Sequence, residues 1–89
     1  MTSASVRVPN RLGLHARAAA RFVHLASRFR SRVLVGCGGR CMDGKSILGI
    51  LLLAAAQGVE IEVSAEGPDE GPAVAALVEL VASGFGEGA

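Results

Sequence analysis

The 89-residue sequence predicts an α+β fold in which one four-stranded sheet is covered on one face by three helices. Three observations predict this class. Strand and helix patterns follow one another in the order β-α-β-β-α-β-α, both long helical segments carry one apolar stripe, and the clearest strand has one apolar and one acidic face. Segments that are apolar on one side pack as one sheet with helices on one side of it. We therefore expect residues 1–89 to form a single domain around one core.

The first strand is predicted over residues 3–8, where polar and apolar side chains alternate, and Pro9 ends it because proline lacks an amide donor. A loop over residues 9–14 leads into an amphipathic helix, which we expect to run from Ala16 to Phe29. At 100° per residue, its apolar face is formed by Ala18, Ala19, Phe22, Val23, Leu25, Ala26 and Phe29. The opposite face carries Arg17, Arg21, His24 and Arg28.

A hairpin is predicted next, from a strand over Val33–Cys37, a two-residue turn at Gly38-Gly39 and a short strand over Arg40–Met42. Asp43-Gly44 ends the hairpin. We expect Ser46 to be the N-cap of a short helix over Ile47–Leu53, because its hydroxyl can accept a hydrogen bond from a free amide of the first turn.

The most regular strand pattern lies between a turn at Gln57-Gly58 and the last helix. It runs through residues 59–66, with apolar side chains on one face and acidic or small polar ones on the other. We expect Asp69 to cap the last helix, with Glu70 and Pro72 in its first turn and Gly84 as its stop. The apolar stripe of this helix is Val74, Leu77, Val78 and Val81.

Charge is divided along the chain in a way that the formal net charge of +1 hides. Residues 1–42 hold eight Arg and no acid, whereas residues 43–89 hold Lys45 and all eight acids. With three Phe and no Tyr or Trp, the chain has few platforms for stacking bases, which argues against single-strand nucleic-acid binding. The longest apolar run covers only residues 47–56, where a membrane span needs about 20 residues. We expect a cytoplasmic protein without stable membrane association.

His15 is the residue best placed for chemistry. It precedes the Arg-bearing helix directly, so its ring should lie beside the unpaired amides and the positive dipole end of that helix. A neutral imidazole can accept a phosphoryl group there, while the amides and Arg17 hold the phosphate oxygens. The alternative is an ordinary histidine at a helix start, with the arginines forming a solvated face.

Four segments of the sequence resemble HPr, the histidine-containing phosphocarrier family of the phosphoenolpyruvate:sugar phosphotransferase system. They are Asn10–Arg17, which resembles the active-site segment, Gly44–Gly49, which resembles the regulatory-serine motif, Leu53–Ile61, and Leu77–Leu80 with Ser83–Phe85. The resemblance covers residues 3–87 in register. It implies an open-faced β-sandwich with a four-stranded antiparallel sheet.

The resemblance also implies roles for individual residues. His15 would accept a phosphoryl group on Nδ1 from phosphorylated enzyme I and pass it to an enzyme IIA, with Arg17 neutralising the phosphate. Ser46 would be a regulatory phosphorylation site, used where an HPr kinase/phosphorylase is present. The residues expected to bind partners are Arg21, Ile47, Leu48 and Leu51. We thus expect a monomeric phosphoryl carrier rather than an enzyme in its own right, acting without a cofactor. The family usually has Pro at the position of Ala18, and we expect transfer to tolerate Ala because it is the better helix former.

The two cysteines are expected to be free thiols. With Gly38-Gly39 as the turn, Cys37 pairs with Arg40 and Cys41 with Gly36, which sends the thiols to opposite faces of the hairpin. Two cysteines are too few for a zinc site, so we expect no metal.

Three other functions remain open at this point. The chain could be a regulatory, nitrogen-type carrier that relays phosphate to control proteins. Its arginine face could bind nucleic acid with a steep salt dependence. A thiol redox protein would need a bridge between the cysteines, which the expected turn disfavours.

Overall fold

The structure of the chain, a computed structural model, describes residues 1–86, so Glu87 lies outside the described residues. It confirms the order β-α-β-β-α-β-α. The elements are β1 (Thr2–Arg7), α1 (Ala16–Ala26), β2 (Arg32–Cys37), β3 (Arg40–Asp43), α2 (Ile47–Leu53), β4 (Glu60–Glu66) and α3 (Glu70–Ala82), followed by a 3₁₀ turn, η1 (Gly84–Gly86). Within residues 1–86, no helix combines the length and the apolar character needed to cross a bilayer.

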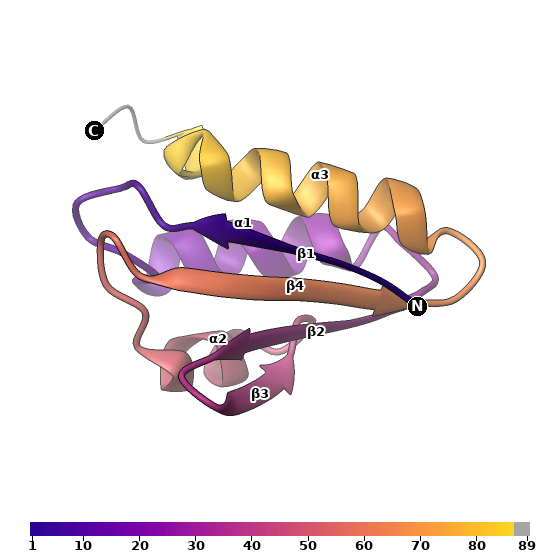
Figure 1. Cartoon of the computed structure of the whole chain (residues 1–89). Coiled ribbons are helices and arrows are strands. Elements are labelled where there is room, and N and C mark those ends of the chain that lie inside the picture. Colours follow the sequence, from indigo (N-terminus) through magenta and orange to yellow (C-terminus); the bar gives the residue numbers. More distant parts are fainter. Residues whose placement is uncertain (87–89) are drawn as a thin grey trace.

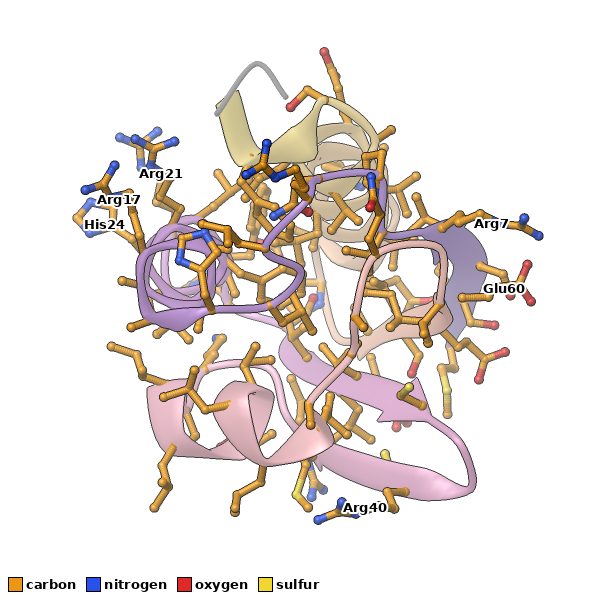
Figure 2. The ribbon with its side chains drawn as sticks, turned by 90° about the vertical axis from the view of Figure 1, so that its left-hand side faces the viewer. Arg7, Arg17, Arg21, His24, Arg40 and Glu60 are labelled. Carbon is orange, nitrogen blue, oxygen red and sulfur yellow. The ribbon has the colours of Figure 1, made fainter. Side chains whose placement is uncertain are left out.

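The four strands form one antiparallel sheet in the order β1-β4-β2-β3 (Figure 1). Val63, in the central strand β4, pairs with Ala4 on one side and with Val35 on the other. These residues belong to the face on which the helices pack, whereas Arg7 and Glu60 point away from it on the open face (Figure 2). The predicted open-faced α+β arrangement is confirmed.

The core lies between the sheet and the helices, and each layer contributes to it. Phe22 of α1, Ile50 of α2 and Leu77 of α3 are at most 1% exposed, and they meet Ile61 and Val63 of β4 in one cluster. Burying side chains of this size contributes about 1.5–3 kcal/mol each. This shared core fixes the three helices relative to the sheet.

The first helix is shorter than the sequence predicted. It ends at Ala26 rather than Phe29, and the amides of Arg28 and Phe29 donate to the carbonyls of Leu25 and Ala26 over 3.0 and 3.1 Å. These bonds span three residues and tighten the chain before β2 begins. The carbonyl of Phe29 accepts from Lys45 Nζ at 2.8 Å, so the segment between α1 and β2 is bonded to the residue just before Ser46.

Asp69 occupies the N-cap position of α3, but the prediction that its side chain caps the helix is wrong. Its carboxylate accepts from the amides of Arg30 and Ser31, each at 2.9 Å, and from the Ser31 hydroxyl at 2.5 Å. These bonds, led by the one from the Ser31 hydroxyl, lower the pKa of Asp69 to about 2. Asp69 thus ties the loop after α1 to the start of α3.

Candidate functional site

The loop that delivers His15 to the start of α1 is held in one conformation by hydrogen bonds. Asn10 Nδ2 donates to the carbonyl of Gly13 at 2.8 Å, and the Gly13 amide donates back to the carbonyl of Asn10 at 3.1 Å. The amide of Leu14 donates at 2.9 Å to the carbonyl of Ala55, which lies beyond the end of α2. His15 is therefore placed by its own loop and by the segment after α2.

Gly13 is required at its position for two reasons. Its φ of +63° lies in the left-handed region, which side-chain-bearing residues rarely adopt. A Cβ atom there would lie 2.4 Å from the carbonyl oxygen of Ala55 and 3.0 Å from Cα of Ala56. Only glycine lets the two chain segments come this close.

His15 directly precedes α1, as the sequence predicted, and it is the N-cap residue of that helix. Its Nδ1 atom accepts from the backbone amide of Arg17 at 3.3 Å, and its carbonyl accepts from the amide of Ala19 at 2.8 Å. The amides of residues 16–18 have no acceptor within the helix, since the first turn of any α-helix leaves its amides free. The ring is partly exposed. A group bound to Nδ1 would therefore reach both solvent and the positive end of the helix dipole.

The basic residues of α1 form one stripe, which we call the basic stripe: Arg17, Arg21, His24 and Arg28, at spacings of four, three and four. Figure 2 shows Arg17, Arg21 and His24 on the outer side of α1, away from the sheet. Arg21 is not wholly available to a partner, because its Nη1 donates to the carbonyl of Phe85 in η1. Within residues 1–86 the only ion pair joins the amino group of Met1 to Glu70, so no carboxylate of this part of the chain forms an ion pair with the stripe.

The division of charge along the sequence persists only in part, because Arg7 and Arg32 pair in register with Glu60 and Glu66, while the acids of β4 lie away from α1. Glu60, Glu62 and Glu66 are exposed and belong to the open face of the sheet. In Figure 2, Glu60 lies on the opposite side of the molecule from Arg17. A partner with an acidic surface is therefore drawn toward the α1 side of the molecule.

Ser46 is the N-cap of α2, as predicted, and its hydroxyl accepts from the amide of Gly49 at 3.1 Å. The structure does not bring Ser46 close to His15. The bond from Lys45 to Phe29 places the start of α2 beside the end of α1. The Leu14–Ala55 bond places the end of α2 beside the start of α1. The two helices are therefore antiparallel, and Ser46 lies roughly one length of the 11-residue α1 from His15, about 16 Å at 1.5 Å per residue.

The exposed side chains of α2 form an apolar patch, which we define as Ile47, Leu48 and Leu52, with exposed fractions of 43%, 67% and 48%. Leu51, which the sequence indicated for this surface, is partly buried and packs on the core. Leu52 was missed, although its spacing of four from Leu48 places both on one helix face. Leu12, in the loop before His15, is 69% exposed and was also missed.

The hairpin has the predicted register, with Cys37 opposite Arg40 and Cys41 opposite Gly36. Both cysteines are free thiols in the structure. Cys41 is exposed, while Cys37 is partly buried against the core. Over residues 1–86, no group of three or more His, Cys, Asp or Glu side chains is arranged to hold a metal ion.

Comparison with known proteins gives consistent results. The sequence model described as "PTS HPr component phosphorylation site" matches residues 2–83. The phosphocarrier protein HPr of Neisseria meningitidis is 46% identical over 88 residues, and that of Pseudomonas aeruginosa is 45% identical over 89 residues. Each alignment covers 99% of both chains. The crystal structure of HPr-C-His from Thermoanaerobacter tengcongensis superposes with a TM-score of 0.94 at 45% identity, covering 98% of both chains. The phosphocarrier protein HPr of Bacillus anthracis gives a TM-score of 0.87 at 38% identity, covering 90% of this chain and 95% of that one.

Proposed function

The chain belongs to the HPr family of phosphocarrier proteins of the phosphotransferase system, and on that premise we propose that His15 Nδ1 is the atom that carries the phosphoryl group. The observation that carries the proposal is the placement of Nδ1 at the start of α1, within hydrogen-bond distance of the Arg17 amide. We propose phosphorylated enzyme I as the donor and an enzyme IIA as the acceptor.

The transfer step follows from the state of the ring. Because Nδ1 accepts the hydrogen bond from the Arg17 amide, this nitrogen carries the lone pair that can attack phosphorus. The lone pair attacks phosphorus, the new N–P bond forms, and the bond between phosphorus and the donor's leaving atom breaks with its electron pair going to the donor. Transfer to the acceptor reverses this sequence and returns the lone pair to Nδ1.

The surroundings of His15 suit a reversible carrier. Once Nδ1 is bonded to phosphorus, the Arg17 amide is free to donate to a phosphate oxygen, and the exposed guanidinium of Arg17 can pair with two further oxygens. Both contacts lie at the surface, where water weakens them. The phosphoryl group is thus stabilised enough to form and weakly enough to leave.

The assignment is tested by incubation with enzyme I and phosphoenolpyruvate, followed by detection of an acid-labile phosphate. We expect His15→Ala to remain unlabelled and His24→Ala to be labelled like the wild type. His24 is the matched control because it lies on the same helix but nine residues from the N-cap. Labelling of His15→Ala together with loss of labelling in His24→Ala would reverse the assignment.

We propose that partners dock on the apolar patch of α2, which packs beside α1. Its three side chains are solvent-exposed, and exposed apolar groups of this size are commonly interaction sites. Leu51 lies on the same helix and packs on the core, so it fixes α2 and the patch relative to the rest of the domain. Arg21 adds positive charge to this side of the molecule while holding the Phe85 carbonyl.

Ser46 is proposed as a regulatory site for an HPr kinase/phosphorylase. A phosphate on Ser46 would add a charge of about −1.5 to −2 next to Ile47 and Leu48. That charge would have to be desolvated when a partner covers the apolar patch, and it would repel acidic groups drawn to the basic stripe. We therefore propose that phosphorylation of Ser46 slows phosphotransfer to His15 without disturbing the fold.

Variants that mimic this charge test the regulatory proposal. We expect Ser46→Asp to melt no lower than Ser46→Ala, because a carboxylate is also favourable at a helix start. Its initial rate of phosphorylation by enzyme I should fall well below that of Ser46→Ala. Ser5→Asp adds the same charge on the open face of the sheet and should keep the wild-type rate. Equal rates for the two aspartate variants would leave Ser46 as a structural cap only.

We also propose which branch of the phosphotransferase system the carrier serves and in which oligomeric state it works. The Gly44-Lys45-Ser46 context favours a sugar-type carrier over a nitrogen-type regulatory one. Comparing transfer to purified IIA proteins of the two branches distinguishes them.

We propose a cytoplasmic monomer as the working form, which light scattering at micromolar concentration tests. One solved relative, from Thermoanaerobacter tengcongensis, is described as an HPr dimer, so a dimer is the specific alternative outcome.

A further inference from the structure

A shallow groove of about 270 Å³ lies between α1 and α3, on the side of α1 that faces away from α2. It is lined by Arg21, His24, Leu25, Arg28 and Leu80. Leu25 and Leu80 are partly buried and form an apolar floor, while the other three residues form a basic wall. We call this feature the α1–α3 groove.

The groove shares Arg21, His24 and Arg28 with the basic stripe, but it lies on the flank of α1 opposite the apolar patch. Placing successive residues of α1 at 100° steps puts Ala16, Ala20 and Ser27 between the basic stripe and α2. All three side chains are small and exposed, so the surface of α1 next to the apolar patch carries no large side chain from these positions. Arg28 and Leu25 lie on the other flank, toward α3. In Figure 2, α3 is above α1 and α2 is below it.

The charges in the groove are all of one sign, and among residues 1–86 none of them forms an ion pair. No acidic residue lines it, and within residues 1–86 the single ion pair lies elsewhere, at Met1 and Glu70. Arg21 is held in place through its bond to the carbonyl of Phe85. The basic groups at 21, 24 and 28 extend over seven residues, which is about 10 Å or two helical turns. A row of this length matches several acidic groups rather than one.

We propose that the α1–α3 groove docks an acidic, helical segment of a partner protein. One apolar side chain of that segment rests on Leu25 and Leu80, and acids one turn apart on the same face meet the basic wall. This is helix-in-groove recognition, in which spacings of three, four and seven residues set the fit. The groove leaves His15 and the apolar patch uncovered, so a partner bound here does not have to exchange phosphate.

A synthetic helical peptide tests the proposal, with glutamates at i, i+3 and i+7 around one leucine. Added to the isotope-labelled full chain, it should shift the amide signals of the groove residues and not those of α2. Arg28→Gln and Leu80→Gln should each weaken binding roughly tenfold, and raised salt should weaken it further. Leu48→Gln is the matched control on the apolar patch and should bind like the wild type. A peptide with glutamine in place of glutamate should not bind.

Several results would overturn the proposal. They are peptide shifts centred on α2, equal loss of affinity in Leu48→Gln and Leu80→Gln, or no loss in Arg28→Gln. Binding of phosphatidylglycerol vesicles that Arg28→Gln abolishes would assign the groove to a lipid surface instead. Dimerisation abolished by Leu80→Gln would assign it to a second copy of the chain. Thermal melting of each variant separates local loss of binding from loss of fold.

Discussion

Replacing Gly13 by Ala should damage the site more than the fold. An alanine at φ +63° carries a backbone penalty of about 1–2 kcal/mol. Its Cβ would also lie 2.4 Å from the carbonyl oxygen of Ala55, a distance that real Cβ atoms do not tolerate. The two segments must separate, which lengthens or breaks the 2.9 Å bond from Leu14 to Ala55 and removes a further ~0.5–1.5 kcal/mol.

Gly38 provides the matched control for this change. Its φ of +58° is nearly the same, but an added Cβ meets no atom within 4 Å. Gly38→Ala should therefore show the backbone penalty alone, and Gly13→Ala should unfold with about 1 kcal/mol less stability than Gly38→Ala. For a domain of this size, 1 kcal/mol corresponds to a difference of about 4–8 °C in Tm.

The two variants should differ more in function than in stability. Gly13 lies two residues before His15, so a displaced loop moves Nδ1 away from the start of α1. A misplacement of about 1 Å can slow transfer on the order of 100-fold. We expect Gly38→Ala to accept phosphate from enzyme I at the wild-type rate and Gly13→Ala to accept it far more slowly. Equal melting temperatures and equal rates in the two variants would refute the argument from the Ala55 contact.

Three further predictions use other parts of the molecule. Arg17→Ala should slow phosphotransfer much more than Arg28→Ala, because Arg28 lies about 16 Å farther along the chain; equal losses would mean that the basic stripe acts as a diffuse field. The pKa of Asp69 is lowered in the folded state, so its contribution to stability is complete above about pH 4 and is lost as pH falls toward 2. Asp69→Asn should therefore flatten the dependence of Tm on pH in this range, and an unchanged profile would contradict the assignment. Cys37 and Cys41 should both be alkylated in protein purified without reductant, and an intact mass showing no modified thiol would contradict the hairpin register.

Most of the fold could be predicted from the sequence because each element is amphipathic by itself. The alternation through residues 59–66 and the stripe on α3 report which faces are buried before any tertiary contact is known. The errors come from contacts between distant segments. Beyond the end of α1 the carbonyl of Phe29 accepts from Lys45, and the side chain of Asp69 accepts from Ser31 rather than from its own helix. Neither partner can be inferred from local patterns.

In the candidate site, too, local features could be predicted from the sequence and contacts between distant segments could not. The N-cap position of Ser46 was predictable because capping is local and serine is a preferred N-cap residue. The place of His15 directly before α1 was predictable from the start of the amphipathic pattern. The sequence could not show that Arg21 binds the carbonyl of Phe85, 64 residues away. Helical spacing did not rank Leu51 against Leu52, since Leu51 lies four residues after Ile47 and Leu52 four residues after Leu48, and only packing on the core separates them.

The separation of Ser46 from His15 bears on how a charge at one can control the other. A specific protein interface covers about 800 Å² on each partner, a patch roughly 28 Å across. Ser46 lies about 16 Å from His15 along the antiparallel pair of α1 and α2. A partner large enough to reach His15 from the α2 side therefore also covers Ser46, and a phosphate there enters the interface without touching the reacting atoms. Under the proposed regulation, control of transfer requires no change in the conformation of His15, only an unfavourable charge within the surface on which we propose that phosphate-exchanging partners dock.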